Sequence, residues 1–100
     1  MTYSIKISLL AQIEFEESIL FYDKNLVGLG LRFSEDIFEA FNSIARNPEA
    51  YPNKKSKFRE YILEKFPFII VYEVVVQNKT INILHVFHTS RNPKFKITKS

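Results

Sequence analysis

The residues best suited to chemistry on an anionic substrate gather near the end of the chain, in the run His88-Thr-Ser-Arg91-Asn-Pro93-Lys-Phe95. The run follows an apolar stretch that is typical of a buried strand. Histidine is the only side-chain type in it that changes charge near neutral pH, so His88 is the candidate general acid or base. The guanidinium of Arg91 can hold two phosphate oxygens at once. The run is therefore a candidate site for binding or cleaving a phosphodiester.

A second group of cations precedes the apolar stretch, and it extends the candidate site. Cleavage of RNA by its own 2′-hydroxyl needs a base, an acid and cations that stabilise the charge on the phosphate. Arg59 and Arg91 are candidates for the cations, and Phe95 can stack on a base. The candidate catalytic residues are Arg59, Arg91 and His88, and the candidate nucleic-acid-binding residues are Lys54, Lys55, Lys57, Lys94, Phe95 and Lys96.

Each candidate also has a structural interpretation. Arg59 can pair with an acid such as Glu64 or Glu73, and His88 can fix a turn by hydrogen bonding to the backbone around residues 92 and 93. The lysines at 54, 55 and 57 can belong to a solvated loop. His85 lies three residues before His88, so on a regular strand it points to the other face of the sheet, and we interpret it as structural.

Charge is distributed unevenly along the chain. Residues 1–50 carry eight acidic and four basic side chains, a net charge of −4, whereas residues 51–100 carry three and ten, a net charge of +7. The overall charge is +3. A basic half of this kind suggests an anionic partner such as nucleic acid.

Length and composition indicate one globular domain over residues 1–100, with 46% apolar and 25% charged residues. The chain has no cysteine, which excludes disulfides and cysteine-based metal sites. No apolar run reaches the roughly 18 residues of a membrane span, and the first residues lack the apolar core of a signal peptide. We therefore expect a cytoplasmic protein that does not contact membranes.

The first half of the chain predicts a strand followed by two helices. Residues 3–8 alternate as a strand does, and Ser8 is a candidate cap for a helix that ends near Asn25. A second helix follows the glycines at 28 and 30, and Pro48 closes it. In the first helix the residues that recur at helical spacing are Ala11, Phe15, Ser18, Ile19 and Tyr22, and the apolar stripe of the second consists of Phe33, Ile37, Ala40, Phe41 and Ile44.

The second half of the chain predicts strands. Residues 48–57 have the composition of a loop, residues 58–64 alternate weakly, and residues 68–76 and 80–87 read as a hairpin joined by a turn at 77–79. Residues 94–98 can add a short final strand. The expected fold class is α+β, with an N-terminal strand and a helical hairpin packed on an antiparallel sheet in the order β-α-α-β-β-β.

Several pieces of the chain, taken in order, resemble the RelE/ParE superfamily of bacterial toxins from type II toxin–antitoxin systems, including plasmid stabilisation systems. No single piece is specific, but their order and spacing extend over about 90 residues. The matching pieces are Ala11 and Tyr22, Gly28 and Phe33, Asn47-Pro48, Tyr51, Arg59, Phe66-Pro67-Phe-Ile-Ile-Val-Tyr72 and His88-x-x-Arg91-x-Pro93.

The resemblance implies a toxin held inactive by a cognate antitoxin, and it implies two possible targets. RelE-like members cut mRNA on the ribosome, so the first hypothesis is an endoribonuclease, or mRNA interferase, that arrests translation and growth. ParE-like members inhibit DNA gyrase without a recognised ribonuclease site. The alternative of a gyrase inhibitor is favoured by Phe95, because a phenyl ring can stack but cannot transfer a proton. A third possibility is a relative that binds antitoxin and is not toxic.

No cofactor or metal is expected from the sequence. The Gly28-Leu-Gly30 run resembles part of a phosphate-binding loop, but it joins two helices and lacks the further glycine. The histidines at 85 and 88 have no carboxylate or thiolate at a useful ligand spacing.

Overall fold

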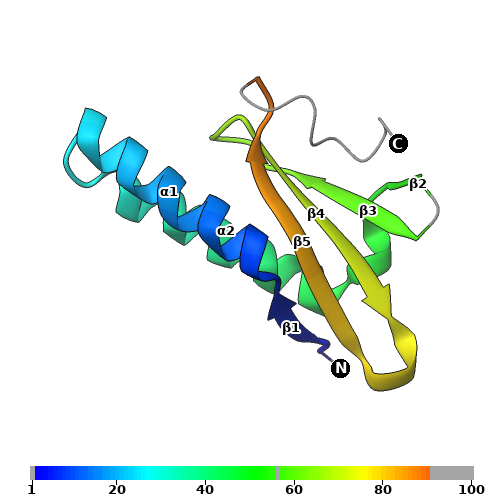
Figure 1. The fold of residues 1–100 in the computed structure, drawn as a ribbon. Coiled ribbons are helices and arrows are strands. Elements are labelled where there is room, and N and C mark those ends of the chain that lie inside the picture. Colours follow the sequence, from blue (N-terminus) through cyan, green and yellow to red (C-terminus); the bar gives the residue numbers. More distant parts are fainter. Residues whose placement is uncertain (1, 56, 91–100) are drawn as a thin grey trace.

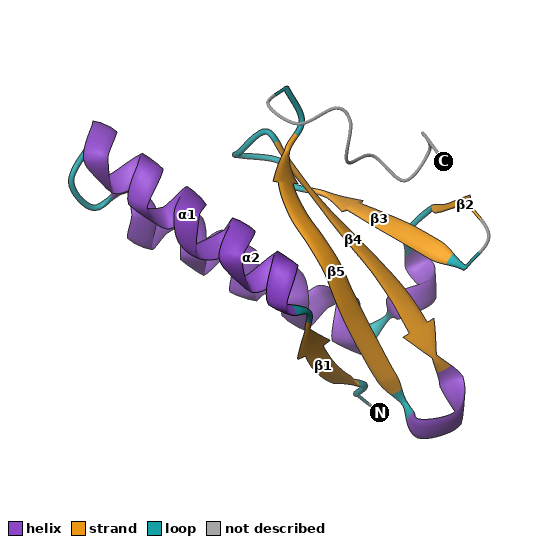
Figure 2. Ribbon diagram, viewed as in Figure 1, coloured by secondary structure: helices purple, strands orange, loops and turns teal. Residues whose placement is uncertain are grey.

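The computed structural model describes residues 2–55 and 57–90, which form a helical hairpin packed against a sheet (Figures 1 and 2). The order of elements confirms the predicted α+β fold. Helices and strands run in the order β1 (Ser4–Ile7), α1 (Leu9–Asn25), α2 (Leu29–Arg46), β2 (Asn53–Lys55), β3 (Phe58–Ile62), β4 (Phe68–Val75) and β5 (Thr80–His88). Two short 3-10 helices lie in the connections: η1 (Pro48–Ala50) between α2 and β2, and η2 (Val76–Asn78) between β4 and β5. The strand β2 lies within the segment that the sequence predicted to be a loop, and the expected final strand at 94–98 lies outside the described residues.

The sheet has five strands in the order β1-β5-β4-β3-β2. Neighbouring strands are antiparallel from β2 to β5, as predicted. The exception is β1, which runs parallel to β5, with Ser4 opposite Thr80 and Ile7 opposite Ile83. The N-terminal strand therefore extends the sheet beside its last strand, and α1 starts where β1 leaves the edge (Figure 1).

The helical hairpin is fixed at both ends of α1. The Ser8 hydroxyl accepts a hydrogen bond from the Ala11 N–H at 3.0 Å, so Ser8 is the helix cap that the sequence predicted. At the tip, Gly28 adopts a left-handed φ of 91° that favours glycine. A Cβ on Gly30 would lie 2.6 Å from the Ile19 carbonyl oxygen, so this glycine allows close approach of the two helices. The Gly-Leu-Gly run therefore has a packing role.

The core lies between the hairpin and one face of the sheet. Phe33 on α2 is fully buried, and its ring centroid lies 4.7 Å from that of Phe68 and 5.2 Å from that of Tyr22. The buried cluster contains the apolar residues of both helical patterns predicted from the sequence, either as members or as partly buried neighbours. Among the described residues, no helix has the length and apolar character needed to cross a membrane.

Candidate functional site

The pairing registers sort the side chains of β3, β4 and β5 onto two faces, because directly paired residues share a face. The face that packs on the helices is called the helix-side face, and the opposite one the far face. The helix-side face carries Arg59, Tyr61, Phe68, Ile70, Tyr72, Ile81, Ile83, Val86 and His88. The far face carries Phe58, Glu60, Ile62, Ile69, Val71, Glu73, Asn82, His85 and Phe87. His85 and His88 thus point to opposite faces, as their spacing predicted.

Arg59 points to the helix-side face and holds the connection between α2 and β2. Its Nη1 donates a hydrogen bond of 2.6 Å to the Tyr51 carbonyl oxygen and a long one of 3.5 Å to that of Glu49. The sequence suggested a carboxylate partner in Glu64 or Glu73, but these contacts are with backbone carbonyls. Arg59 therefore has a structural task, and a catalytic role for it stays a prediction.

Tyr72 lies directly opposite Arg59 in the β3–β4 ladder and holds the same connection. Its side chain is fully buried, and its hydroxyl donates a 2.6 Å hydrogen bond to the Pro48 carbonyl oxygen. Burial raises the pKa of Tyr72 to about 12, although the nearby guanidinium of Arg59 acts in the opposite direction. The phenol is therefore held neutral as a hydrogen-bond donor.

His88 ends β5 and supports the turn that follows. Its Nδ1 accepts a hydrogen bond from the Ser90 N–H at 3.0 Å, and its ring meets that of Phe68 edge-on at 5.3 Å. This contact matches the turn-fixing interpretation, and the described backbone partner is Ser90. Residues 92 and 93 lie outside the described residues.

Arg59 and His88 share a face but lie at opposite ends of it. Arg59 pairs with Tyr72 and His88 pairs with Phe68, four residues away along β4. This separation corresponds to about 13 Å along the strand at about 3.3 Å per residue. The two described members of the predicted catalytic set are therefore not in direct contact range of one phosphate.

The charged residues described on the far face are mainly acidic. Glu73 accepts a hydrogen bond from Asn82 Nδ2 at 2.9 Å and pairs with Lys57 Nζ at 3.2 Å. These contacts, led by that of Asn82, lower the pKa of Glu73. Glu60 lies on the same face and is 9% exposed. Both carboxylates of this face are therefore mostly buried, and the described lysine Lys57 is paired with one of them.

The remaining candidates lie outside what the structure describes. Arg91, Lys94, Phe95 and Lys96 follow the described residues, and the side chains of Lys54 and Lys55 are not described. Within residues 2–55 and 57–90, no group of three histidine, aspartate or glutamate side chains is arranged to hold a metal ion.

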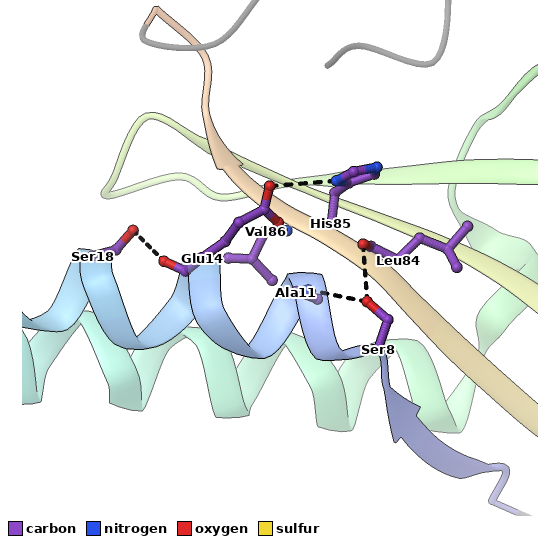
Figure 3. A network of polar contacts seen from close by, with 7 residues as sticks. All are labelled: Ser8, Ala11, Glu14, Ser18, Leu84, His85 and Val86. Atoms are coloured by element: carbon purple, nitrogen blue, oxygen red, sulfur yellow. Dashed lines mark hydrogen bonds and ion pairs between the residues drawn. The ribbon is translucent and has the colours of Figure 1, made fainter.

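A polar network that the sequence did not predict fastens α1 to β5 (Figure 3). Tyr72 pairs with Ile83 and Val71 with His85, so Leu84 is an extra residue that forms a β-bulge. The Ser8 hydroxyl donates to the Leu84 carbonyl at 3.1 Å, and the Glu14 carboxylate accepts from the Val86 N–H at 2.8 Å. The helix thus satisfies backbone groups along the part of β5 that β1 does not cover.

Glu14 has a second neighbour in this network. Its Oε2 lies 3.4 Å from His85 Nδ1, and both side chains are mostly buried. The helical pattern placed Glu14 between the apolar positions, but it gave no sign that the carboxylate would reach a strand about seventy residues later. His85 therefore has the structural surroundings that we expected for it.

A hollow of about 330 Å³ lies between α2 and the end of β3. Three carboxylates and two cations contribute to its lining, from Asp36, Glu39, Glu64, Arg46 and Lys65. The hollow is therefore not a cationic site of the kind that binds a nucleic-acid backbone.

The described residues form a small α+β domain in which a helical hairpin packs on one face of a five-stranded sheet. The sequence profile described as "ParE toxin of type II toxin-antitoxin system, parDE" matches residues 5–93. The chain therefore belongs to the ParE toxin family of type II toxin–antitoxin systems. No functionally curated protein matches the sequence.

Solved structures share the fold at low sequence identity. The chain is similar to a chain of the chromosomal ParDE system from P. aeruginosa, with a TM-score of 0.75, 21% identity, and coverage of 87% of this chain and 96% of that chain. It is also similar to the E. coli toxin RelE in the free state, with a TM-score of 0.70, 16% identity, and coverage of 93% and 90%. A chain of the intact E. coli RelBE complex gives a TM-score of 0.68 at 14% identity, with coverage of 89% and 99%. These matches establish the fold.

Proposed function

We propose that this toxin arrests growth by binding DNA gyrase, without catalysing a reaction of its own. The observation that carries the proposal is the separation of Arg59 and His88 on the helix-side face, where they pair with Tyr72 and Phe68, four residues apart along β4. A ribonuclease needs its cation and its acid or base around the same phosphate. These two candidates do not meet in that way. The match to the ParE side of the superfamily supports the same target.

The position of Arg59 also favours the gyrase proposal. A phosphate-binding guanidinium must present its N–H groups to the substrate. The Nη1 group of Arg59 donates to the Tyr51 and Glu49 carbonyl oxygens. Recruiting it to RNA would break contacts that hold the loop before β2.

The second candidate function is ribosome-dependent mRNA cleavage. It is favoured by the net charge of +7 over residues 51–100, to which Arg91, Lys94 and Lys96 contribute. In that case His88 would act as acid or base and the cations after β5 would bind the phosphates.

In both cases we propose a cognate antitoxin as the partner that holds the toxin inactive. Solved structures with this fold include the ParDE and RelBE toxin–antitoxin systems. An acidic, partly disordered antitoxin segment would complement the basic second half of the chain. Because gyrase and ribosomes are both cytoplasmic, the proposal places the protein in the cytoplasm.

Two assays on the same protein separate the candidate targets. In the first, purified chain is titrated into a gyrase supercoiling reaction, with relaxation by another topoisomerase as the control. We expect supercoiling to be inhibited and relaxation to be unchanged. Unchanged supercoiling at saturating protein would overturn the gyrase proposal.

In the second assay, RNA 5′ ends are mapped within minutes of inducing the chain alone, beside the Arg59→Ala/Arg91→Ala variant. Because Arg59 also holds a loop, Arg91→Ala alone and Arg59→Lys accompany the double variant. We expect growth arrest without new ends. New ends with codon periodicity that vanish in Arg91→Ala would establish the ribonuclease. Normal growth and active gyrase would indicate a relative that is not toxic.

A further inference from the structure

The outer surface of α1, turned away from the core, carries a row of exposed apolar side chains. Leu9, Ile13 and Leu20 are 74%, 42% and 70% exposed, and Leu10 and Phe21 flank them. With 3.6 residues per turn these five positions fall on one side of the helix. The buried residues of the same helix, Ala11 and Ser18, fall on the opposite side. We call the five residues the α1 outer stripe.

The stripe is unusual because a helix at the surface of a soluble domain normally turns one polar face to water. Here α1 is apolar on two opposite sides. Exposed apolar side chains gathered on one helix face mark an interaction site more often than single exposed residues do. The spacing of Leu9, Ile13 and Leu20 is that of one face of a helix, which suits a partner helix lying along it.

The charges within the stripe indicate what the partner must carry. One turn in the middle of the stripe is occupied by Glu16 and Glu17, both exposed, between Ile13 and Leu20. A partner helix that covers the apolar positions on both sides must pass over these carboxylates. Burying them without an opposite charge is costly, so the partner needs Lys or Arg at that turn.

The same charges argue against a second copy of this chain as the occupant. In a parallel pair of α1 helices, or an antiparallel pair centred on the stripe, Glu16 and Glu17 of both copies would face each other. An antiparallel pair shifted to bring Glu17 onto Lys24 would cover Leu20 and Phe21 but leave Leu9, Leu10 and Ile13 exposed. Neither arrangement buries the whole stripe and also places a cation beside Glu16 and Glu17.

We propose that the α1 outer stripe docks an amphipathic helix of another protein, with apolar residues against Leu9, Ile13 and Leu20 and a cation over Glu16 and Glu17. Leu9, Ile13 and Leu20 lie on the side of α1 opposite its buried residues, which face the core. The inference does not depend on whether gyrase or mRNA is the target.

The test uses the full chain and two synthetic helices of about 18 residues. Both have leucines spaced to meet the stripe, and they differ only in carrying Lys or Glu at the position that meets Glu17. Fluorescence anisotropy measures the affinity of each. We expect the Lys peptide to bind at least about tenfold more tightly at low salt, because opposite charges replace like ones across the contact.

Charge reversal in the protein makes the test specific. Glu17→Lys should invert the preference between the peptides, and Ile13→Glu with Leu20→Glu should abolish binding of both. Val76→Glu is the matched control, because Val76 is a 57% exposed apolar residue in the β4–β5 connection, far from α1. Unchanged melting temperatures establish that the variants are folded.

Two outcomes would overturn the proposal. The first is equal affinity for the Lys and Glu peptides, or binding that survives the double substitution. The second is a concentration-dependent dimer of the wild-type chain in light scattering that Leu20→Glu abolishes, because the occupant would then be a second copy.

Discussion

The Glu14 carboxylate accepts a 2.8 Å hydrogen bond from the backbone N–H of Val86, and so joins residues 72 positions apart. A strand edge with unpaired N–H groups can pair with other chains. Here the helix supplies the acceptor beyond the end of β1. The contact therefore both positions α1 and closes part of the sheet edge.

Removing this acceptor should weaken the fold. Glu14→Ala leaves the Val86 N–H without its partner in a mostly buried place, so we expect a loss of about 1–3 kcal/mol in the free energy of unfolding. Urea denaturation measures the change. Glu17→Ala, on the exposed side of the same helix, should change stability by less than about 0.5 kcal/mol. Equal effects of the two substitutions would contradict the anchoring role.

Tyr72→Phe should reduce stability and also its dependence on alkaline pH. Loss of the hydroxyl leaves the Pro48 carbonyl without its donor, at a cost of about 1–2 kcal/mol. Burial raises the pKa of Tyr72 from 10.0 to about 12, so the folded chain holds this proton more tightly than the unfolded chain does. Its stabilising contribution is complete below pH 10.0 and declines as the pH rises to about 12. Denaturant titrations across this range should show a steeper decline for the wild type than for Tyr72→Phe, whereas parallel curves would refute the assignment.

The two glycines of the hairpin should respond differently to alanine. At Gly30 the new methyl group would meet the Ile19 carbonyl oxygen at 2.6 Å and the Asp23 carboxylate that caps the Gly30 N–H. We expect a loss of about 1–3 kcal/mol, as for an overpacked site. Gly28→Ala has no clash within 4 Å, and its cost of about 1–2 kcal/mol comes from the left-handed backbone. Gly28→Asn should recover part of that cost but Gly30→Asn should not, which thermal melts can check.

Arg59→Ala should loosen the connection between α2 and β2. The guanidinium donates to the Tyr51 and Glu49 carbonyls, so its loss should speed hydrogen exchange in residues 49–53 and lower stability by about 1 kcal/mol. Arg59→Lys keeps the charge but not the fork of donors, and should show part of the effect. If Arg59→Ala exchanged at the wild-type rate, Arg59 would act only in ligand binding and would not hold this connection.

Asn82→Ala should make the fold less sensitive to acid. The amide of Asn82 is the main reason why the pKa of Glu73 lies below its ordinary value of 4.5. A carboxyl whose pKa is lowered by folding stabilises the protein above its unfolded value and loses that contribution as the pH falls. Comparing stability at neutral pH and below pH 4.5 should therefore give a smaller difference in the variant. Asn42→Ala, at an exposed position on α2, is the control.

The sequence predicted those features of the fold that depend on local patterns. The apolar periods of residues 9–25 and 29–46 gave both helices, and Ser8 and Pro48 marked two of their boundaries. The parallel pairing of β1 with β5 was not predicted, because nothing in residues 4–7 specifies a partner in residues 80–83. The short strand β2 was missed because its pairing with β3 depends on a register that a polar segment does not reveal.

The candidate site was less predictable than the fold. Residue types alone indicated Arg59 as a phosphate ligand, but its contacts depend on where the Glu49 and Tyr51 carbonyls lie in three dimensions. The hydrogen bond from the Tyr72 hydroxyl to Pro48 was not predicted, because the position of Tyr72 in an apolar strand indicated only packing. The contacts of Glu14 were missed for the same reason as the pairing of β1 with β5, since in both cases the partner is distant in the sequence.

The parallel pairing of β1 with β5 has a consequence for the order of events during synthesis. In the sheet β5 lies between β1 and β4. Neither β1 nor β4 can pair with it until residues 80–83 have left the ribosomal tunnel. Contacts between sequence-distant segments of this kind raise the contact order and slow folding. A nascent chain that stops before residue 80 has no strand to join its two halves of the sheet. The sheet can therefore be completed only after residues 80–83 have been synthesised.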